Sequence, residues 1–255
     1  MEILVCVKRV PTVGGVLTLT TDQRAIDVKT SGFTISPHEE CAVEEAVRLV
    51  ERFGGSVTVV SLGSVAAEEQ LRACLALGAS AAVLLETPEG VETGPIATAA
   101  ALHAVAAPGA FDLVLLGNEA SDTGDYQVGI RLAHLLGTPV VTGIKAISVS
   151  GDGSLLSASR TYLGVLETFT LPLPCVVTVK EGINLPRYPS LPGRLRAKRA
   201  SITRVPAGDA VAGGDVRMTR LRVPDAPKKQ ATVLGQGSDA VPALISVLTE
   251  LGVLS

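Results

Sequence analysis

Short runs of Val, Leu and Ile recur along most of this sequence, and a stretch with helical periodicity follows most of them. The runs are apolar throughout rather than alternating, which is typical of parallel strands covered on both faces. Strands that alternate with helices predict a three-layer α/β fold with a parallel sheet. The strands are expected at 2–7, 57–62, 81–86, 112–117, 139–144 and 174–179.

Apolar stripes at helical spacing predict helices at 43–53, 66–78, 95–107 and 126–137, with Gly78 as a C-cap. The first helix is preceded by Ser36, Pro37 and Glu39, a capping-box pattern with a favoured proline at the first helical position. Capping alone explains this pattern, but such a helix start also attracts anions. His38 is expected to be an exposed first-turn residue rather than a catalyst.

Two regions depart from the alternation of strand and helix. Residues 144–172 contain the turn sequence VSGDGSLL and predict an antiparallel excursion from the parallel sheet. The region after Gly182 has a Gly/Ala/Asp linker at 207–215, a strand-like piece at 218–223 and a final helix from about Asp239 to Leu251. A tail with so little core of its own packs either on its own domain or on a partner subunit.

A polar, glycine-containing loop, GNEASDTGDYQVG at 117–129, joins the strand at 112–117 to the next helix. It therefore lies at the carboxyl edge of the sheet, where open α/β sheets bind ligands. Gly124 and Gly129 permit close approach of a backbone. The loop is either a solvated connection or a binding loop with a phosphate at the helix start near 125–128. In the second case Asp122 and Asp125 face ribose hydroxyls or the backbone.

Composition and missing motifs exclude several classes of protein. The formal net charge of -3 argues against a general polyanion binder. The four cysteines are scattered without a C-x-x-C pair, so neither a zinc site nor a disulfide framework is expected, and a reducing compartment is indicated. No dinucleotide fingerprint, Walker loop or nucleophile elbow is present. With no apolar run of about 18 residues and no leader, a cytoplasmic protein without a membrane span is expected.

The stretch 187–204 is rich in arginine, lysine and proline and has no acid. Prolines at 186, 189 and 192 predict a stiff extended loop with Leu191 as an exposed apolar tip among positive charges. An exposed apolar side chain that can enter a pocket of a partner, with charges around it, is typical of protein docking. We prefer this interpretation to nucleic-acid binding.

Several of these stretches together resemble the β subunit of electron transfer flavoprotein, the family that includes the FixA proteins. The likeness runs from Met1 to about Arg204. It rests on ILVCVKRVP, SPHEECAVEEAVRL, LRACLALGA, DLVLLGNEASDTGDYQVG and LPCVVTVKEGINLPRYPSLPGRLRAKR. The sequence departs from the family pattern at Ser36, where asparagine is usual, at Thr161, where an acid commonly follows the arginine, and at Val165, where a second glycine is common.

The resemblance implies a Rossmann-like domain of the adenine nucleotide alpha hydrolase-like type over 1–205, with a C-terminal arm, 206–255, that packs on a partner α subunit. It implies an electron carrier rather than an enzyme. The α subunit holds a redox-active FAD, and the β subunit holds a structural AMP, or a second FAD in bifurcating members. The implied partners are the α subunit, flavin dehydrogenases and a quinone oxidoreductase or similar acceptor.

The resemblance also assigns two groups of residues. Docking of the dehydrogenase is assigned to Tyr188, Pro189, Ser190, Leu191, Pro192, Gly193, Arg194, Leu195 and Arg196. Nucleotide contacts are assigned to Cys6, Ser36, Pro37, His38, Glu39, Val59, Leu62, Gly117, Asn118, Glu119, Ala120, Ser121, Asp122, Thr123, Gly124, Asp125, Tyr126, Gln127 and Val128.

Two other interpretations compete with this one. A stand-alone ATP- or AMP-binding module of the same fold, like the stress proteins, predicts no stable partner and no use for the tail. An adenylylating enzyme needs a Gly/Ser phosphate loop after the first strand, and VPTVGGVLTLTT lacks that signature.

Overall fold

The computed structural model describes residues 1–12, 18–27, 32–91, 93–208, 211, 216, 218–223 and 231–254. The chain forms two compact units, Met1–Leu221 and Arg222–Ser255. The first unit contains the sheets, the helices that cover them and every buried residue described below. None of the described residues of the second unit is buried.

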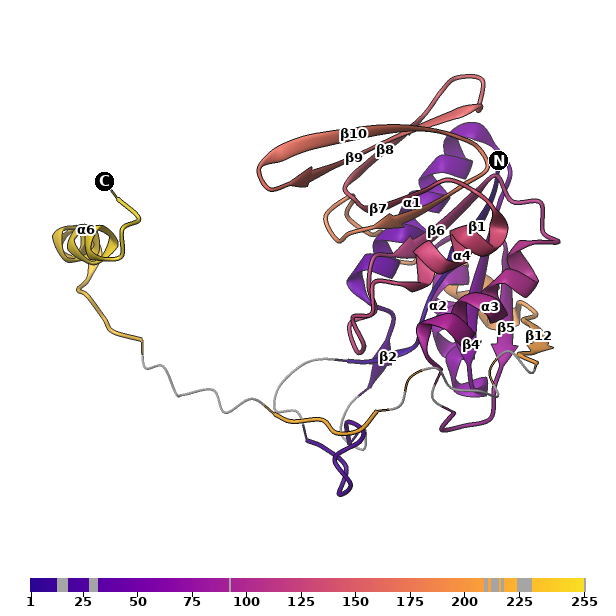
Figure 1. The fold of residues 1–255 in the computed structure, drawn as a ribbon, viewed down its shortest axis with the longest axis horizontal. Helices are drawn as coiled ribbons and strands as arrows, with labels where there is room; N and C mark the ends of the chain where they lie inside the picture. The colour runs from indigo at the N-terminus through magenta and orange to yellow at the C-terminus, as the bar shows by residue number, and fades with distance from the viewer. Residues whose placement is uncertain are drawn as a thin grey trace. The chain divides into compact units, whose positions relative to one another are not determined.

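A seven-stranded parallel sheet forms the centre of the first unit, in the order β12-β5-β4-β1-β6-β11-β7 (Figure 1). The chain moves from β1 to β4 and β5 on one side, then returns to place β6 on the other side of β1. The strand order therefore reverses between β1 and β6. The strands are β1 (Glu2–Cys6), β4 (Ser56–Gly63), β5 (Ala81–Glu86), β6 (Leu113–Gly117), β7 (Val140–Ile144), β11 (Cys175–Val179) and β12 (Thr203–Pro206).

This arrangement confirms the predicted parallel α/β sheet and the strand positions within it. The edge strand β12 was not expected, because its sequence TRVP is exposed throughout, contains a proline and has no apolar run. Proline and exposed residues are compatible with an edge strand but not with a central one. Only pairing with β5 turns this stretch into a strand.

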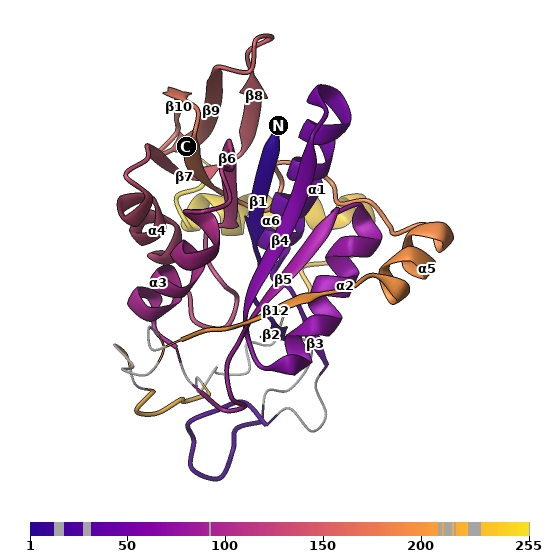
Figure 2. The ribbon, with the colours of Figure 1, turned by 90° about the vertical axis from the view of Figure 1, so that its right-hand side faces the viewer.

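Helices cover both faces of the sheet, as Figure 2 shows. α1 and α2 pack on one face in a core that includes Val43, Leu71 and Val57. α3 and α4 pack on the other face around Leu102, Leu132 and Leu4. All four predicted helices are confirmed, and the short helix η2 (Val65–Ala67) leads into the second. Their bounds are α1 (Pro37–Phe53), α2 (Glu68–Leu77), α3 (Pro95–Ala106) and α4 (Val128–Leu136).

The predicted antiparallel excursion is confirmed as a three-stranded sheet of β8 (Ala146–Val149), β9 (Leu155–Tyr162) and β10 (Val165–Pro172). Leu156 and Leu171 of this sheet are buried in the core on the α1 face. The β9–β10 tip is exposed, including Leu163 and Leu166. A second antiparallel pair, β2 (Val10–Pro11) with β3 (Phe33–Thr34), lies beyond the end of β1.

The prediction of an extended loop around Leu191 is wrong, because residues Leu191–Arg199 form the helix α5. The Ser190 hydroxyl accepts a hydrogen bond from the Gly193 N–H at 3.1 Å and caps the helix. Pro192 lies in the first turn, where a missing N–H costs nothing. Gly193 also permits close packing on α2, since a Cβ there would lie 2.5 Å from the Ala76 carbonyl oxygen.

The second unit contains the short helix η4 (Gly237–Ala240) and α6 (Val241–Glu250), in agreement with the predicted final helix. Residues 218–223 form no strand, contrary to the prediction, and the Leu221 N–H instead donates to the Gln23 carbonyl at 2.7 Å. Residues 209–210 and 212–215 of the predicted linker lie outside the described residues. Within the described part of the chain, no helix is long and apolar enough to cross a membrane.

Candidate functional site

A cleft opens at the carboxyl edge of the parallel sheet, where the strand order reverses between β1 and β6. We call it the edge cleft; its interior has a volume of about 100 Å³, and it opens to solvent at its mouth. It is lined by Cys6, Val7, Lys8, Glu39, Leu62, Thr93, Pro95, Thr98, Leu102, Leu116, Gly117, Asn118, Glu119, Ala120, Thr123, Asp125, Tyr126, Gln127, Val128 and Gly129.

Gly117 lets the start of α1 approach the end of β6. A Cβ at this position would lie 2.8 Å from Glu39 Cγ and 3.1 Å from His38 Cβ. Both distances are shorter than ordinary contacts between carbon atoms, so only glycine fits without displacing the first turn of α1. The cleft therefore depends on close contact between a strand end and a helix start.

The loop after Gly117 is held by a chain of hydrogen bonds across three strand ends. The Gly143 N–H donates to Thr178 Oγ1 at 3.0 Å, and the Thr178 hydroxyl donates to Asn118 Oδ1 at 2.8 Å. The Asn118 N–H donates to the Val179 carbonyl at 2.9 Å. The Asn118 side-chain oxygen already accepts a hydrogen bond from Thr178. The amide NH2 of the same side chain can therefore serve as the donor to a ligand in the cleft.

Ionisable side chains in and beside the cleft lie close to one another. Lys8 Nζ lies 2.8 Å from the Asp122 carboxylate, and His38 Nδ1 lies 3.9 Å from Glu119. Burial lowers the pKa of His38, although the nearby Glu119 opposes this effect, so the imidazole is neutral at pH 7. A hydrogen bond to Glu119 raises the pKa of Tyr126, which adopts a left-handed backbone with φ 58°.

Glu39 is buried at the inner end of the cleft, with 6% of its surface exposed. Its carboxylate accepts hydrogen bonds from the Lys8 N–H at 3.0 Å and from the Ser36 N–H at 3.2 Å, the latter being one half of the predicted capping box. Burial raises the pKa of Glu39 to about 7, and the two N–H donors only partly offset this effect. Burial, and then the charge of Glu39, raises the pKa of Cys6, so Cys6 remains a thiol.

The raised pKa of Glu39 predicts a pH-dependent stability. The protonated Glu39 carboxyl stabilises the folded state, because the folded protein holds this proton more tightly than the unfolded chain. This stabilisation is fully present below the ordinary pKa of 4.5 and is lost as the pH rises through about 7. Between pH 4.5 and 8, the wild type is expected to lose roughly 3 kcal/mol more unfolding free energy than Glu39→Gln, which keeps an acceptor oxygen but does not titrate. Urea unfolding of the wild type and of Glu39→Gln at several pH values, with the same amount of bound nucleotide in both, measures this difference in unfolding free energy. Parallel pH profiles would contradict the assignment.

The donor set of the edge cleft fits an adenine nucleotide. Leu62, Leu102 and Leu116 supply an apolar wall for a flat base. The start of α4 at Val128 supplies helix N–H groups suited to a phosphate. The acidic lining residues must then face ribose hydroxyls or backbone donors, because a carboxylate beside a phosphate is unfavourable.

The structure brings many of the expected nucleotide contacts together and leaves others out. Val59 packs in the core on the α1 face and does not line the cleft. Ser36, Pro37, His38, Ser121, Asp122 and Gly124 lie in neighbouring turns rather than in its lining. The lining residues that the sequence did not reveal include Lys8, Thr93 and Thr98. Lys8 follows the first strand directly, so its place at the strand's carboxyl end was a usable signal.

Residues 188–196 lie apart from the lining of the edge cleft and present apolar side chains to solvent. The exposed fraction is 94% for Tyr188, 71% for Leu191 and 53% for Leu195. Arg194, Arg196, Lys198 and Arg199 of α5 surround them with positive charge. Among the described residues, no group of acids, histidines and cysteines is arranged to hold a metal ion.

Comparisons with known proteins place the chain among its relatives. A model of the electron transfer flavoprotein domain matches residues 26–210. Electron transfer flavoprotein subunit beta of Bacillus subtilis is 36% identical over 220 residues, 84% of this chain and 85% of that protein. The human subunit is 33% identical over 255 residues, 99% of this chain and 98% of that protein. The Bradyrhizobium diazoefficiens subunit is 33% identical over 257 residues, the full length of both chains.

Proposed function

The chain belongs to the family of electron transfer flavoprotein β subunits, and on that premise we propose that it acts as the β subunit of a heterodimeric electron carrier. Its partner is an α subunit that holds FAD, and the FAD supplies the redox chemistry when bound. The β subunit contributes a bound adenine nucleotide and a docking surface. We assign no bond-making step to this chain.

The edge cleft is the observation that carries the nucleotide part of the proposal. It lies where the strand order reverses, has an apolar wall, and joins the start of α4 to the end of β6. A bound AMP ties these elements together and stabilises the folded state by ligand linkage. We assign a structural role to this AMP, and the side chains nearby support it: burial raises the pKa of Cys6 and lowers the pKa of His38, which favours the uncharged form of both.

The docking part of the proposal is supported by the exposed row of Tyr188, Leu191 and Leu195. Several large, exposed apolar side chains in one segment indicate a surface that binds a partner. The surrounding arginines steer an acidic partner surface toward the row. We assign this partner as a flavin dehydrogenase that delivers electrons, with a quinone oxidoreductase or similar acceptor downstream.

Nucleotide content tests the proposal. The chain is co-expressed with the α subunit of the same organism, the complex is purified and denatured, and the released nucleotides are identified by chromatography and absorbance. One FAD and one AMP per heterodimer is the expected result. Two FAD would show a redox-active flavin in the edge cleft and a bifurcating carrier. A chain that purifies without a partner and holds ATP alone would contradict the proposal and favour a stand-alone nucleotide-binding module.

A further inference from the structure

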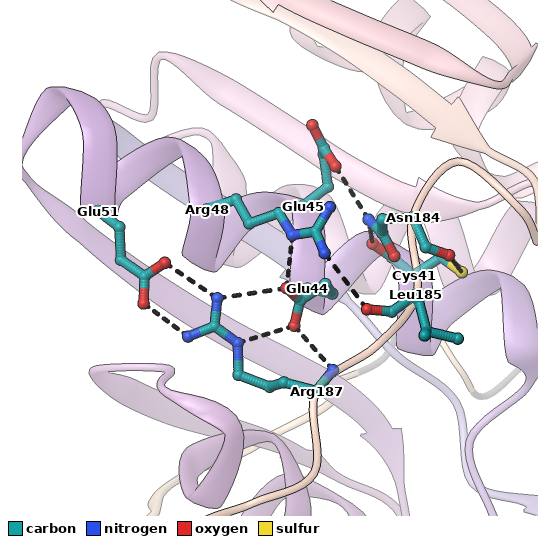
Figure 3. Close-up of polar contacts among 8 residues, drawn as sticks. All are labelled: Cys41, Glu44, Glu45, Arg48, Glu51, Asn184, Leu185 and Arg187. Carbon is teal, nitrogen blue, oxygen red and sulfur yellow. Dashed lines mark hydrogen bonds and ion pairs between the residues drawn. The ribbon is translucent and has the colours of Figure 1, made fainter.

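Glu44 of α1 is a buried carboxylate in a network that does not touch the edge cleft. Its side chain is 2% exposed. Arg48 Nε donates to it at 2.6 Å, and Arg187 donates to it three times, from Nε at 2.9 Å, from Nη2 at 3.2 Å and from the backbone N–H at 3.1 Å. Figure 3 shows these bonds converging on one carboxylate between the helix and the chain that follows β11.

Burial by itself would raise the pKa of Glu44. The hydrogen bonds from Arg187 and Arg48 outweigh burial, and the pKa of Glu44 lies below its ordinary value. The carboxylate is therefore charged at neutral pH and fully paired. A buried ion pair of this kind is weak evidence for stability, because desolvation offsets the attraction. Its geometric role needs a separate explanation.

The neighbouring residues fix the backbone just before Arg187 to the same helix. The Asn184 amide donates to the Cys41 carbonyl at 3.0 Å and to Glu45 at 2.9 Å. Arg48 Nη2 donates to the Leu185 carbonyl at 3.3 Å. The chain from 184 to 187 is therefore held along α1 by hydrogen bonds to residues on successive turns of the helix (Figure 3).

Arg187 is the last point at which this segment is tied to α1. Its guanidinium also forms a two-pronged contact with Glu51, at 2.6 and 2.9 Å. Beyond it, Tyr188 is almost fully exposed. The next fixed point is the packing of α5 on α2. Gly193 is buried there, with no room for a Cβ beside the Ala76 carbonyl oxygen, and Arg72 of α2 donates to the carbonyls of Ala197 and Ala200 at 2.8 and 3.0 Å. Tyr188 and Leu191 therefore lie between the arginine-based anchor on α1 and the packed part of α5.

We propose that Glu44 is a positioning residue for docking: by holding Arg187 it fixes the start of the 188–196 segment and so presents Leu191 to the dehydrogenase in a single arrangement. This inference rests on the docking function proposed above. A pre-ordered surface binds more tightly because less side-chain and loop freedom is lost on association. Glu44 acts through Arg187 and Leu191 and touches neither the partner nor the nucleotide.

The test compares Glu44→Gln with Glu51→Gln in the purified heterodimer, with a substrate-reduced flavin dehydrogenase of the same organism as the probe. Both changes remove one carboxylate from Arg187, but Glu51 is 56% exposed whereas Glu44 is 2% exposed. Glu44→Gln is expected to raise the KM for the dehydrogenase about tenfold with kcat within about twofold. Glu51→Gln should change the KM by less than about twofold, because exposed pairs contribute little.

Hydrogen exchange gives a second measurement that does not depend on the dehydrogenase. In Glu44→Gln, the amides of 188–196 should exchange faster, while those of 117–128 should keep the wild-type rate. If Glu44→Gln does not fold, Arg187→Lys replaces it, because lysine keeps the charge but loses the forked contacts. Unchanged exchange over 188–196 in a folded variant would overturn the proposal.

A double-mutant cycle with Leu191→Ala separates this inference from the docking function itself. If Glu44 acts by positioning Leu191, then Glu44→Gln should raise the KM by no more than about twofold in the Leu191→Ala background. An equal rise in both backgrounds would overturn the positioning role. If Leu191→Ala raises the KM and Glu44→Gln does not, only this inference fails. If Leu191→Ala itself leaves the KM unchanged, the docking function fails and this inference fails with it.

Discussion

Gly117→Val is expected to yield a heterodimer that retains almost no nucleotide in the β subunit and unfolds more easily. Even the first added carbon would lie 2.8 Å from Glu39 Cγ and 3.2 Å from the Glu39 backbone nitrogen. The Glu39 side chain is buried and held by two N–H donors, so it cannot swing away without breaking them. The first turn of α1 must move, and it carries one wall of the edge cleft with it. Overpacking of this kind costs about 1 to 3 kcal/mol.

The measurements are nucleotide released per heterodimer and the free energy of unfolding in urea. Gly151→Val is the matched control, because a Cβ at Gly151 meets nothing within 4 Å. Full nucleotide content at wild-type stability in Gly117→Val would show that α1 does not form part of the nucleotide site. A loss of stability with normal nucleotide content would show that Gly117 is needed for packing but not for nucleotide binding.

Leu191→Ala is expected to slow electron acceptance from the dehydrogenase roughly 30-fold at low dehydrogenase concentration, as loss of a central apolar anchor costs about 2 kcal/mol. The side chain is 71% exposed, so its removal leaves no cavity and should not change the unfolding free energy. Stopped-flow reduction of the heterodimer by a substrate-reduced flavin dehydrogenase measures the effect. Nucleotide content and assembly with the α subunit should remain at wild-type levels.

Leu166→Ala provides a matched comparison for this variant. Leu166 of β10 is 69% exposed, so the change removes a similar exposed side chain from a different surface. Its electron-transfer rate with the dehydrogenase should stay within about twofold of wild type. Equal rates for Leu191→Ala and wild type would reject α5 as the docking surface, whereas equal losses in both variants would point to a general effect of surface apolar area.

The pattern of apolar residues was enough to predict the main architecture of this protein. Runs such as EILVCV and DLVLLG are typical of strands covered on both faces, and the stripes between them are typical of helices that cover a sheet. Local chemistry also indicated the start of α1, because serine is favoured at the N-cap and proline at the first helical position, where Ser36 and Pro37 lie. The edge loop followed from position alone, since a strand-to-helix connection must lie at the carboxyl edge.

Three features were decided only by tertiary structure. β12 is a strand because β5 offers it an edge, and α5 is a helix because Gly193 and Ala197 fit against α2 while Ser190 caps its start. Prolines indicate where a chain is stiff but do not distinguish a helix start from an extended loop. The ion network of Glu44 joins residues 143 positions apart in the sequence. Sequence patterns reveal interactions that repeat along one element, whereas a contact between distant elements exists only once packing has placed both partners.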